Sequence, residues 1–173
     1  SYLAADIDGD GRLDLMTNGR DADGAYEALL LRGDGRGSFT VVVARRYTAA
    51  EINPGVAAVA DLDGDGLPDL LVASAEHRGA RLFMVRGDGS GRFDGPSTTV
   101  GRGTRVVVVD MDRDGRADLV TAQSHSWLGP EAKVTVYRGT ASGFVESGVF
   151  SAGEYRYASD LFSVADLDVD GLP

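Results

Sequence analysis

An aspartate-rich motif that recurs four times along 173 residues is the feature that most limits how this chain can fold. The copies are "DIDGDGRLDL" from Asp6, "DLDGDGLPDL" from Asp61, "DMDRDGRADL" from Asp110 and "DLDVDGLP" from Asp166, at spacings of 55, 49 and 56 residues. A glycine-rich motif starts 25 to 28 residues after the first three copies: "RGDGRGSF" from Arg32, "RGDGSGRF" from Arg86 and "RGTASGF" from Arg138. Two motifs that keep a constant phase over three periods indicate that each period forms one structural unit.

Short apolar and β-branched runs lie between these motifs. "GVAAVAD", "RVVVVD" and "LFSVAD" lead into the second, third and fourth aspartate motifs, and "LLVAS" and "LVTAQ" follow the second and third. "RLFMVR" and "KVTVYR" precede glycine-rich motifs, and "FTVVVARRY" follows the first one. Such runs predict about four strands in each period and no helix, which is the pattern of β-propeller blades. The runs before the aspartate motifs are nearly all apolar, so we expect them to form innermost strands that are buried on both faces.

The period divides the chain into one propeller domain over 1–173, with repeats at about 1–54, 55–103, 104–159 and a truncated repeat at 160–173. The sequence thus predicts an all-β fold of about three full four-stranded blades plus partial ones. Three blades and a fragment do not close a ring, and closure is how propellers remove exposed strand edges. We therefore expect a part of a larger propeller, of roughly six to eight blades, or one that a second copy completes.

The pattern D-x-D-x-D-G-x-x-D is typical of a calcium loop. Alternate carboxylates at positions 1, 3 and 5 converge on one side of a turn that the glycine at position 6 permits. The backbone carbonyl at position 7 and the aspartate at position 9 can complete a shell of six or seven oxygens, which suits Ca²⁺ better than Mg²⁺. The alternative, a solvated acidic turn, explains the repeated spacing less well. The predicted ligands are Asp6, Asp8, Asp10, Arg12 and Asp14; Asp61, Asp63, Asp65, Leu67 and Asp69; Asp110, Asp112, Asp114, Arg116 and Asp118; and Asp166, Asp168 and Asp170.

The stretch "GVAAVADLDGDGLPDLLVAS", followed by "LFMVRGDGSGRF", resembles the FG-GAP repeat, also described as the VCBS repeat. This repeat occurs in bacterial surface proteins, lectin propellers and integrin alpha subunits. The resemblance implies a β-propeller in which the calcium loop joins the first and second strands of each blade, and in which calcium is structural rather than catalytic. Arg113 and Val169 depart from the glycine at loop position 4, and "RGTASGF" lacks the acidic residue of the other glycine-rich motifs.

Composition excludes several classes of partner and site. The net charge of −10 argues against binding to nucleic acid or to an anionic membrane surface. The chain has no cysteine, so it forms neither disulfides nor thiolate metal sites. It also has no run of about 18 apolar residues, so we expect no membrane insertion.

In a propeller, the calcium loops and the glycine-rich turns fall on one face, and the remaining connections fall on the other. Those connections include "AQSHSWLGPEA" and "SAGEYRYASD", so the candidate ligand-binding residues are Trp127, His125, Tyr155 and Tyr157. Exposed aromatic side chains can stack on sugar rings or contact a protein partner. Packing between blades is the alternative, and for any single residue it is the favoured one.

Two functions agree with these patterns. The first is a non-enzymatic binding or adhesion module, secreted or on the cell surface, for glycan or protein ligands. The second is an accessory propeller of a secreted polysaccharide lyase or hydrolase whose catalytic part lies outside this chain. No nucleophile motif occurs, and the spacing of the aspartates already explains them as ligands, so we expect no enzymatic activity in the chain itself. The two "RGD" tripeptides, from Arg32 and Arg86, suggest turn chemistry more strongly than integrin binding.

Overall fold

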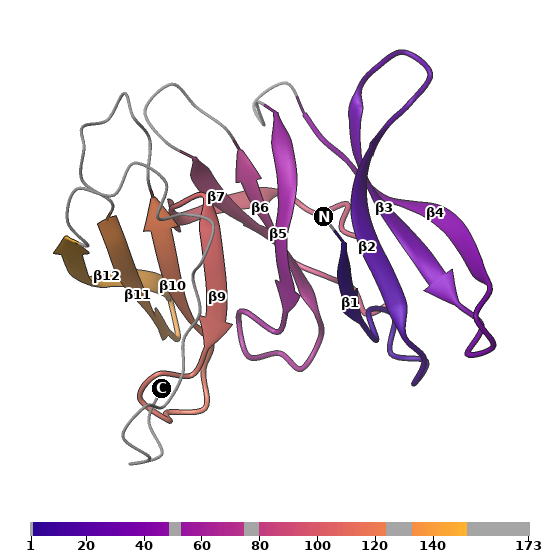
Figure 1. The fold of residues 1–173 in the computed structure, drawn as a ribbon. Coiled ribbons are helices and arrows are strands. Elements are labelled where there is room, and N and C mark those ends of the chain that lie inside the picture. Colours follow the sequence, from indigo (N-terminus) through magenta and orange to yellow (C-terminus); the bar gives the residue numbers. More distant parts are fainter. Residues whose placement is uncertain (1, 49–52, 75–79, 124–132, 152–173) are drawn as a thin grey trace.

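The computed structural model describes residues 2–48, 53–74, 80–123 and 133–151. These residues form twelve strands in three four-stranded antiparallel sheets, with no helix (Figure 1). The first sheet contains β1 (Leu3–Ala5), β2 (Asp14–Arg20), β3 (Tyr26–Gly33) and β4 (Phe39–Arg46). The second contains β5 (Pro54–Ala60), β6 (Asp69–Ser74), β7 (Arg81–Val85) and β8 (Ser97–Arg102). The third contains β9 (Arg105–Val109), β10 (Asp118–Gln123), β11 (Lys133–Thr140) and β12 (Gly143–Ser151).

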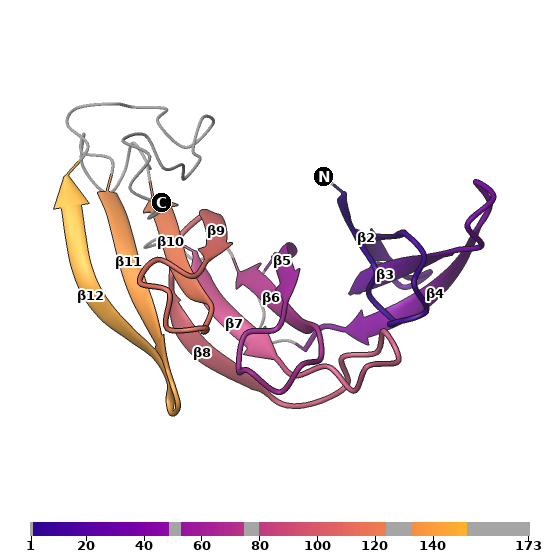
Figure 2. The same ribbon diagram turned by 90° about the horizontal axis from the view of Figure 1, so that it is seen from below.

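Each sheet is a meander in which strands that follow one another in sequence are hydrogen-bonded neighbours. The three sheets stand side by side in an arc, with β1, β5 and β9 on its concave side and β4, β8 and β12 on its outer side (Figure 2). This arrangement confirms the prediction of an all-β chain built from propeller blades, although the described residues do not close a ring. The described part of the chain also contains no helix that could cross a membrane.

Two apolar clusters hold the sheets together, one at each junction. The alternation of side chains along β6 supplies both, because successive residues of a strand point to opposite faces. Leu70 and Val72 pack toward the first sheet with Met16 and Leu30, and all four side chains are fully buried. Leu71 faces the other way and packs in the second cluster. That cluster also contains Leu62, Leu82, Met84, Leu119 and Tyr137.

The first strand of each sheet is less buried than the sequence suggested. Most residues of β1, β5 and β9 are only partly buried, whereas β6, β7 and β10 contain runs of buried residues. The prediction that the first strands are buried on both faces was therefore wrong. Each first strand is an edge strand with one hydrogen-bonded neighbour, and it lies on the open concave side of the arc. The second strands have a neighbour on both sides, so less of their surface meets solvent.

The connection between β7 and β8 crosses from the second sheet to the first. Phe93 in this connection is 1% exposed and belongs to the cluster between the two sheets. Its backbone N–H donates to the Ala44 carbonyl over 2.9 Å. Arg45 in turn donates through Nη1 to the carbonyls of Phe93 and Gly95, at 2.8 and 3.0 Å. The connection therefore fastens the second sheet to the last strand of the first.

Candidate metal centres

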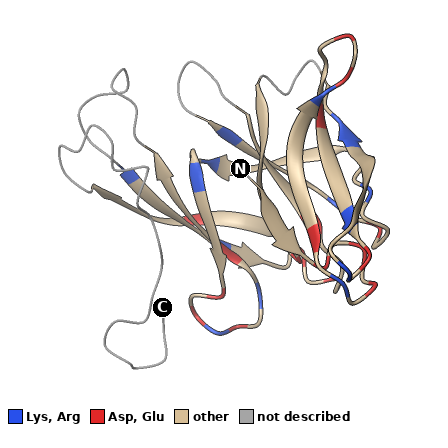
Figure 3. Ribbon diagram, turned by 45° about the vertical axis from the view of Figure 1, so that its right-hand side comes forward, with Lys and Arg blue, Asp and Glu red and all other residues tan. Residues whose placement is uncertain are grey.

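The three aspartate loops that the structure describes occupy equivalent places, between the first and second strands of each sheet. Charged residues of both signs gather in these loops and in the neighbouring turns, at the lower edge of the molecule (Figure 3). The loop between β2 and β3 lies at the opposite end of the first sheet (Figure 1). For the first sheet, this confirms the predicted division of the connections between two faces.

The glycine at loop position 6 adopts a left-handed conformation in every described loop, as the sequence predicts. Its φ is 81° at Gly11, 86° at Gly66 and 85° at Gly115. The departure at position 4 has a structural consequence, because Arg113 has a φ of 59° where the first and second loops have glycine. A non-glycine residue is uncommon in this region, so the third loop carries local strain that the other two avoid.

Backbone N–H groups organise the carboxylates in the same way in all three loops. The Oδ2 atom of the aspartate at position 1 accepts the N–H of the position-6 glycine over 2.9 Å in each loop. The Oδ1 atom of the aspartate at position 5 accepts the N–H of residue 7, over 2.9, 2.8 and 2.9 Å. These bonds fix the loop backbone and leave carboxylate oxygens on its inner side.

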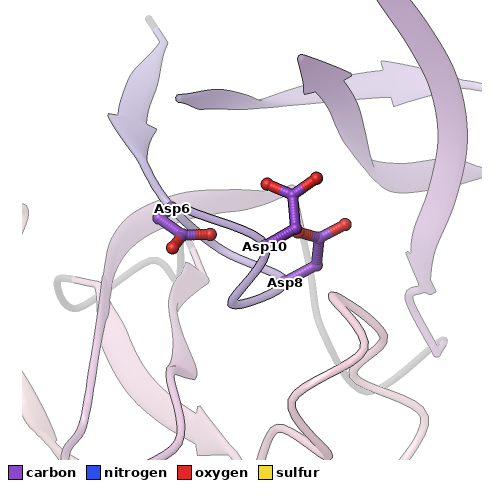
Figure 4. A group of neighbouring side chains, drawn as sticks. All are labelled: Asp6, Asp8 and Asp10. Atoms are coloured by element: carbon purple, nitrogen blue, oxygen red, sulfur yellow. The ribbon is translucent and has the colours of Figure 1, made fainter. Parts of the chain in front are cut away.

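Three carboxylates converge in each loop, and one oxygen from each lies within 4.8 Å of the others. The groups are Asp6, Asp8 and Asp10; Asp61, Asp63 and Asp69; and Asp110, Asp112 and Asp118. Figure 4 shows the first group, whose side chains project from a single loop. Oxygen ligands lie about 2.3–2.6 Å from a bound Ca²⁺, so two ligands of one ion can be up to about 5 Å apart. The spacing in all three loops suits such an ion.

Asp8 provides an independent sign that a cation fits. Its side chain is 11% exposed, and its Oδ1 atom is buried without a hydrogen-bond partner. A buried carboxylate oxygen without a partner is costly, because it has lost its contact with water. A cation bound by the loop would satisfy this oxygen.

The aspartate at position 9 has a structural task besides the ligand role predicted for it. Asp14, Asp69 and Asp118 are the first residues of β2, β6 and β10, and they are 0, 0 and 1% exposed. The Oδ2 atom of each accepts the N–H of loop position 2, in Ile7, Leu62 and Met111, at 3.0, 3.0 and 2.9 Å. The Oδ1 atom of each accepts the backbone N–H of the second residue of the glycine-rich motif. These donors are Gly33, Gly87 and Gly139, at 2.9, 3.0 and 2.7 Å. This carboxylate therefore ties the metal loop to the hairpin beside it.

Burial raises the pKa of Asp69, and the neighbouring carboxylates of Asp63 and Asp65 raise it further. The N–H groups of Gly87 and Leu62 act in the opposite direction. A cation in the loop would also favour the ionised form of Asp69.

The glycine after each arginine is required by a close approach and not by the turn that follows it. A Cβ atom on Gly33, Gly87 or Gly139 would lie 2.1, 1.9 or 2.2 Å from the carbonyl oxygen of loop position 8. Our sequence reasoning assigned this glycine to turn chemistry and missed its contact with the loop. The signal was the recurrence of "RG" at the same phase in all three periods.

The loop aspartates pair with arginines from two places, the start of the glycine-rich motif and loop position 7. The sequence did not indicate these contacts. The Nε atoms of Arg32, Arg86 and Arg138 lie 3.0, 2.8 and 3.1 Å from Oδ2 of the position-3 aspartates Asp8, Asp63 and Asp112. Position 7 supplies a second arginine in two loops. Arg12 lies 3.1 Å from Asp10, and Arg116 lies 3.8 Å from Asp114.

Both "RGD" tripeptides are engaged within the chain. Asp34 accepts the N–H groups of Arg36 and Ser38, over 2.7 and 3.0 Å, and these bonds lower its pKa. Asp88 accepts the hydroxyl and the N–H of Ser90, over 2.6 and 2.8 Å, and its pKa is lowered for the same reason. These contacts agree with the interpretation of both tripeptides as turns.

Part of the predicted site falls outside the described residues. This applies to Asp166, Asp168 and Asp170 of the fourth loop, and to the ligand-binding candidates Trp127, His125, Tyr155 and Tyr157. The ligand roles of all the loop aspartates, and those of the position-7 carbonyls of Arg12, Leu67 and Arg116, stay predictions.

A groove of about 520 Å³ lies between the second and third sheets. Its lining includes the apolar side chains of Met84 and Phe144, the hydroxyls of Thr98 and Thr140, and Arg86. This volume is within the usual range of small-ligand sites, about 300–1,000 Å³.

The sequence matches a known family of repeats. A sequence model described as an FG-GAP-like repeat matches residues 6–72 and 61–121. The first match contains the first and second aspartate loops, and the second contains the second and third. No curated protein matches the chain.

Proposed function

Because the chain belongs to the FG-GAP-like repeat family, we propose that its aspartate loops bind Ca²⁺ and that it is a calcium-stabilised propeller module that binds ligands outside the cell. The convergence of three carboxylates at the same place in each sheet carries the calcium part of this proposal. The unpartnered Oδ1 atom of Asp8 supports it, because the first loop then contains a buried oxygen that a cation would satisfy.

Calcium is favoured over magnesium by the nature of the loops. All side-chain donors are carboxylates on a short irregular loop, which tolerates the variable geometry that Ca²⁺ accepts. Magnesium demands a near-ideal octahedron and retains several waters. A Ca²⁺ ion bound in a loop would neutralise carboxylates that otherwise repel one another. It would also fix the connection between the first two strands of that sheet.

Calorimetric titration with Ca²⁺ tests this part directly. We expect wild-type protein to bind Ca²⁺, and Asp61→Ala to bind one ion fewer because it removes the position-1 carboxylate of the second loop. Asp23→Ala is the matched control, because Asp23 is an exposed aspartate in the loop between β2 and β3. An unchanged stoichiometry in Asp61→Ala would contradict the assignment of this loop.

The module is proposed to act by binding and not by catalysis. The acidic side chains that converge in the described residues are those of the loops, where their spacing and hydrogen bonds already suit a metal ligand. The groove between the second and third sheets supports a binding role, since it combines apolar side chains with hydroxyls and a charged pair. An accessory role beside a secreted polysaccharide lyase or hydrolase is the second candidate, and the groove suits it equally.

A glycan and protein array probed with the purified chain tests the binding role. We expect selective binding in millimolar calcium and its loss in excess EGTA, because the loops beside the groove would lose their order. Retention of glycans or of protein ligands would support the binding role, and selective retention of one polymeric polysaccharide would also agree with the accessory role. Signals that are equal with and without calcium would contradict a calcium-dependent binding module.

A further inference from the structure

We propose that the arginine that opens each glycine-rich motif is a resident counter-cation of the metal loop. It shares an aspartate with the bound Ca²⁺, stabilises the loop when calcium is absent, and weakens calcium binding when calcium is present. This inference rests on the proposed function, because it concerns the affinity of the same loops for Ca²⁺.

The contact is built identically in the three sheets. In each, an arginine in or directly after the third strand reaches Oδ2 of the position-3 aspartate through Nε. The aspartates are 11, 14 and 28% exposed, whereas the arginines are 42, 69 and 56% exposed. In each pair, the arginine is thus more exposed than the carboxylate that it contacts.

The arginine acts through its charge more than through hydrogen-bond direction. Arg32 Nε lies 3.0 Å from Asp8 Oδ2, yet the two atoms are not aligned as a hydrogen bond. In the second and third loops, the loop backbone already orients the same aspartate. Asp63 Oδ1 accepts the N–H of Asp65, and Asp112 Oδ1 accepts the N–H of Asp114, both over 3.2 Å. Loss of the arginine would therefore change the electrostatic potential of the loop more than its shape.

The charge balance differs between loops. The first loop contains four aspartates and pairs with two arginines, giving −4 + 2 = −2, which one Ca²⁺ neutralises. The third loop also pairs with two arginines and contains a further one, Arg113, giving −4 + 3 = −1. The second loop pairs with one arginine, giving −4 + 1 = −3, because Leu67 stands at position 7. Leu67 lies beside Gly89 as Arg12 lies beside Gly35, so it occupies the place of the missing second arginine.

The test measures calcium affinity by calorimetry and the melting temperature in excess EGTA for three variants. Arg86→Met should bind calcium at the second loop about three- to tenfold more tightly, because a cation that repels Ca²⁺ has been removed. The same variant should melt at a lower temperature in EGTA, because its aspartates lose their counter-ion. Arg86→Lys retains the charge and should behave like the wild type in both measurements. Arg92→Met removes an exposed arginine that pairs with Asp94 in the same connection, and it should change neither.

A fourth variant tests the opposite change. Leu67→Arg gives the second loop the arginine that the first and third loops have, and it should weaken calcium binding there by a similar factor. The two measurements separate this proposal from a merely structural role, which would lower the melting temperature of Arg86→Met without tightening calcium binding. Unchanged or weaker binding by Arg86→Met overturns the inference while the proposed function stands. If the wild type itself binds no calcium, the proposed function fails and the inference fails with it.

Discussion

Removal of calcium is expected to lower the free energy of unfolding of this chain by about 4 kcal/mol. A ligand that binds only the folded state adds RT ln(1 + [L]/Kd), which is about 1.4 kcal/mol for each site at ten times its Kd. Three described loops would together add about 4 kcal/mol. For a chain of this length, about 2–4 °C corresponds to each kcal/mol, so the melting temperature should fall by roughly 8–16 °C.

Circular dichroism melting curves in millimolar calcium and in excess EGTA measure this change. Magnesium at the same concentration is the control, and it should restore only a small part of the lost stability because the loops suit Ca²⁺ better. A melting temperature that is the same in calcium and in EGTA would refute the structural role of the loops.

Replacement of Asp69 is expected to have the second-largest effect, and it should persist without calcium. The Asp69 carboxylate is fully buried and accepts the N–H groups of Leu62 and Gly87. Asp69→Ala leaves both donors without this partner at the junction of loop and hairpin. Each lost bond of this kind costs about 1–3 kcal/mol, so the free energy of unfolding should fall by about 3 kcal/mol.

Asp65→Ala is the matched comparison for Asp69→Ala. Asp65 belongs to the same loop, is exposed, and accepts only the N–H of Leu67 among the hydrogen bonds described. Its replacement should lower stability in calcium by about the contribution of one site, roughly 1.4 kcal/mol, and have little effect in EGTA. Chemical denaturation in calcium and in EGTA gives the loss in free energy of unfolding of each variant, relative to the wild type, in each condition. Equal losses for the two variants in EGTA would show that Asp69 does not fasten the hairpin.

The strands and loops were predictable because their signals are local. The run "RVVVVD" predicted a strand where β9 lies, and "LLVAS" predicted one where β6 lies. Glycine at position 6 of each loop indicated a reversal of the backbone, and the positive φ of Gly11 confirms it. Patterns of this kind depend on residues within a few positions of one another, so a single sequence contains them.

The remaining features depend on contacts between segments that are far apart. The apolar run of β5 indicated the innermost place of its strand but not how much of that strand its neighbours cover, so its burial was overestimated. The crossing of Phe93 to Ala44 joins residues of different sheets, and no local pattern encodes it. The pairing of Arg86 with Asp63 spans one loop, two strands and the connection between them. The sequence contains both residues but gives no distance between them.

The contacts of the aspartate loop with the arginine and glycine that open the glycine-rich motif have a consequence for the duplication of repeats. In the second sheet, Asp61, Asp63, Asp69, Arg86 and Gly87 all lie within one period, and the other two sheets repeat the arrangement. A duplication of one period of about 50 residues would therefore carry a complete centre, with its ligands, its buried aspartate and its arginine, into the enlarged chain. Only the packing between sheets, such as that of Phe93, would have to be adapted after each duplication. Repeat number can thus change over evolutionary time without any existing centre being divided.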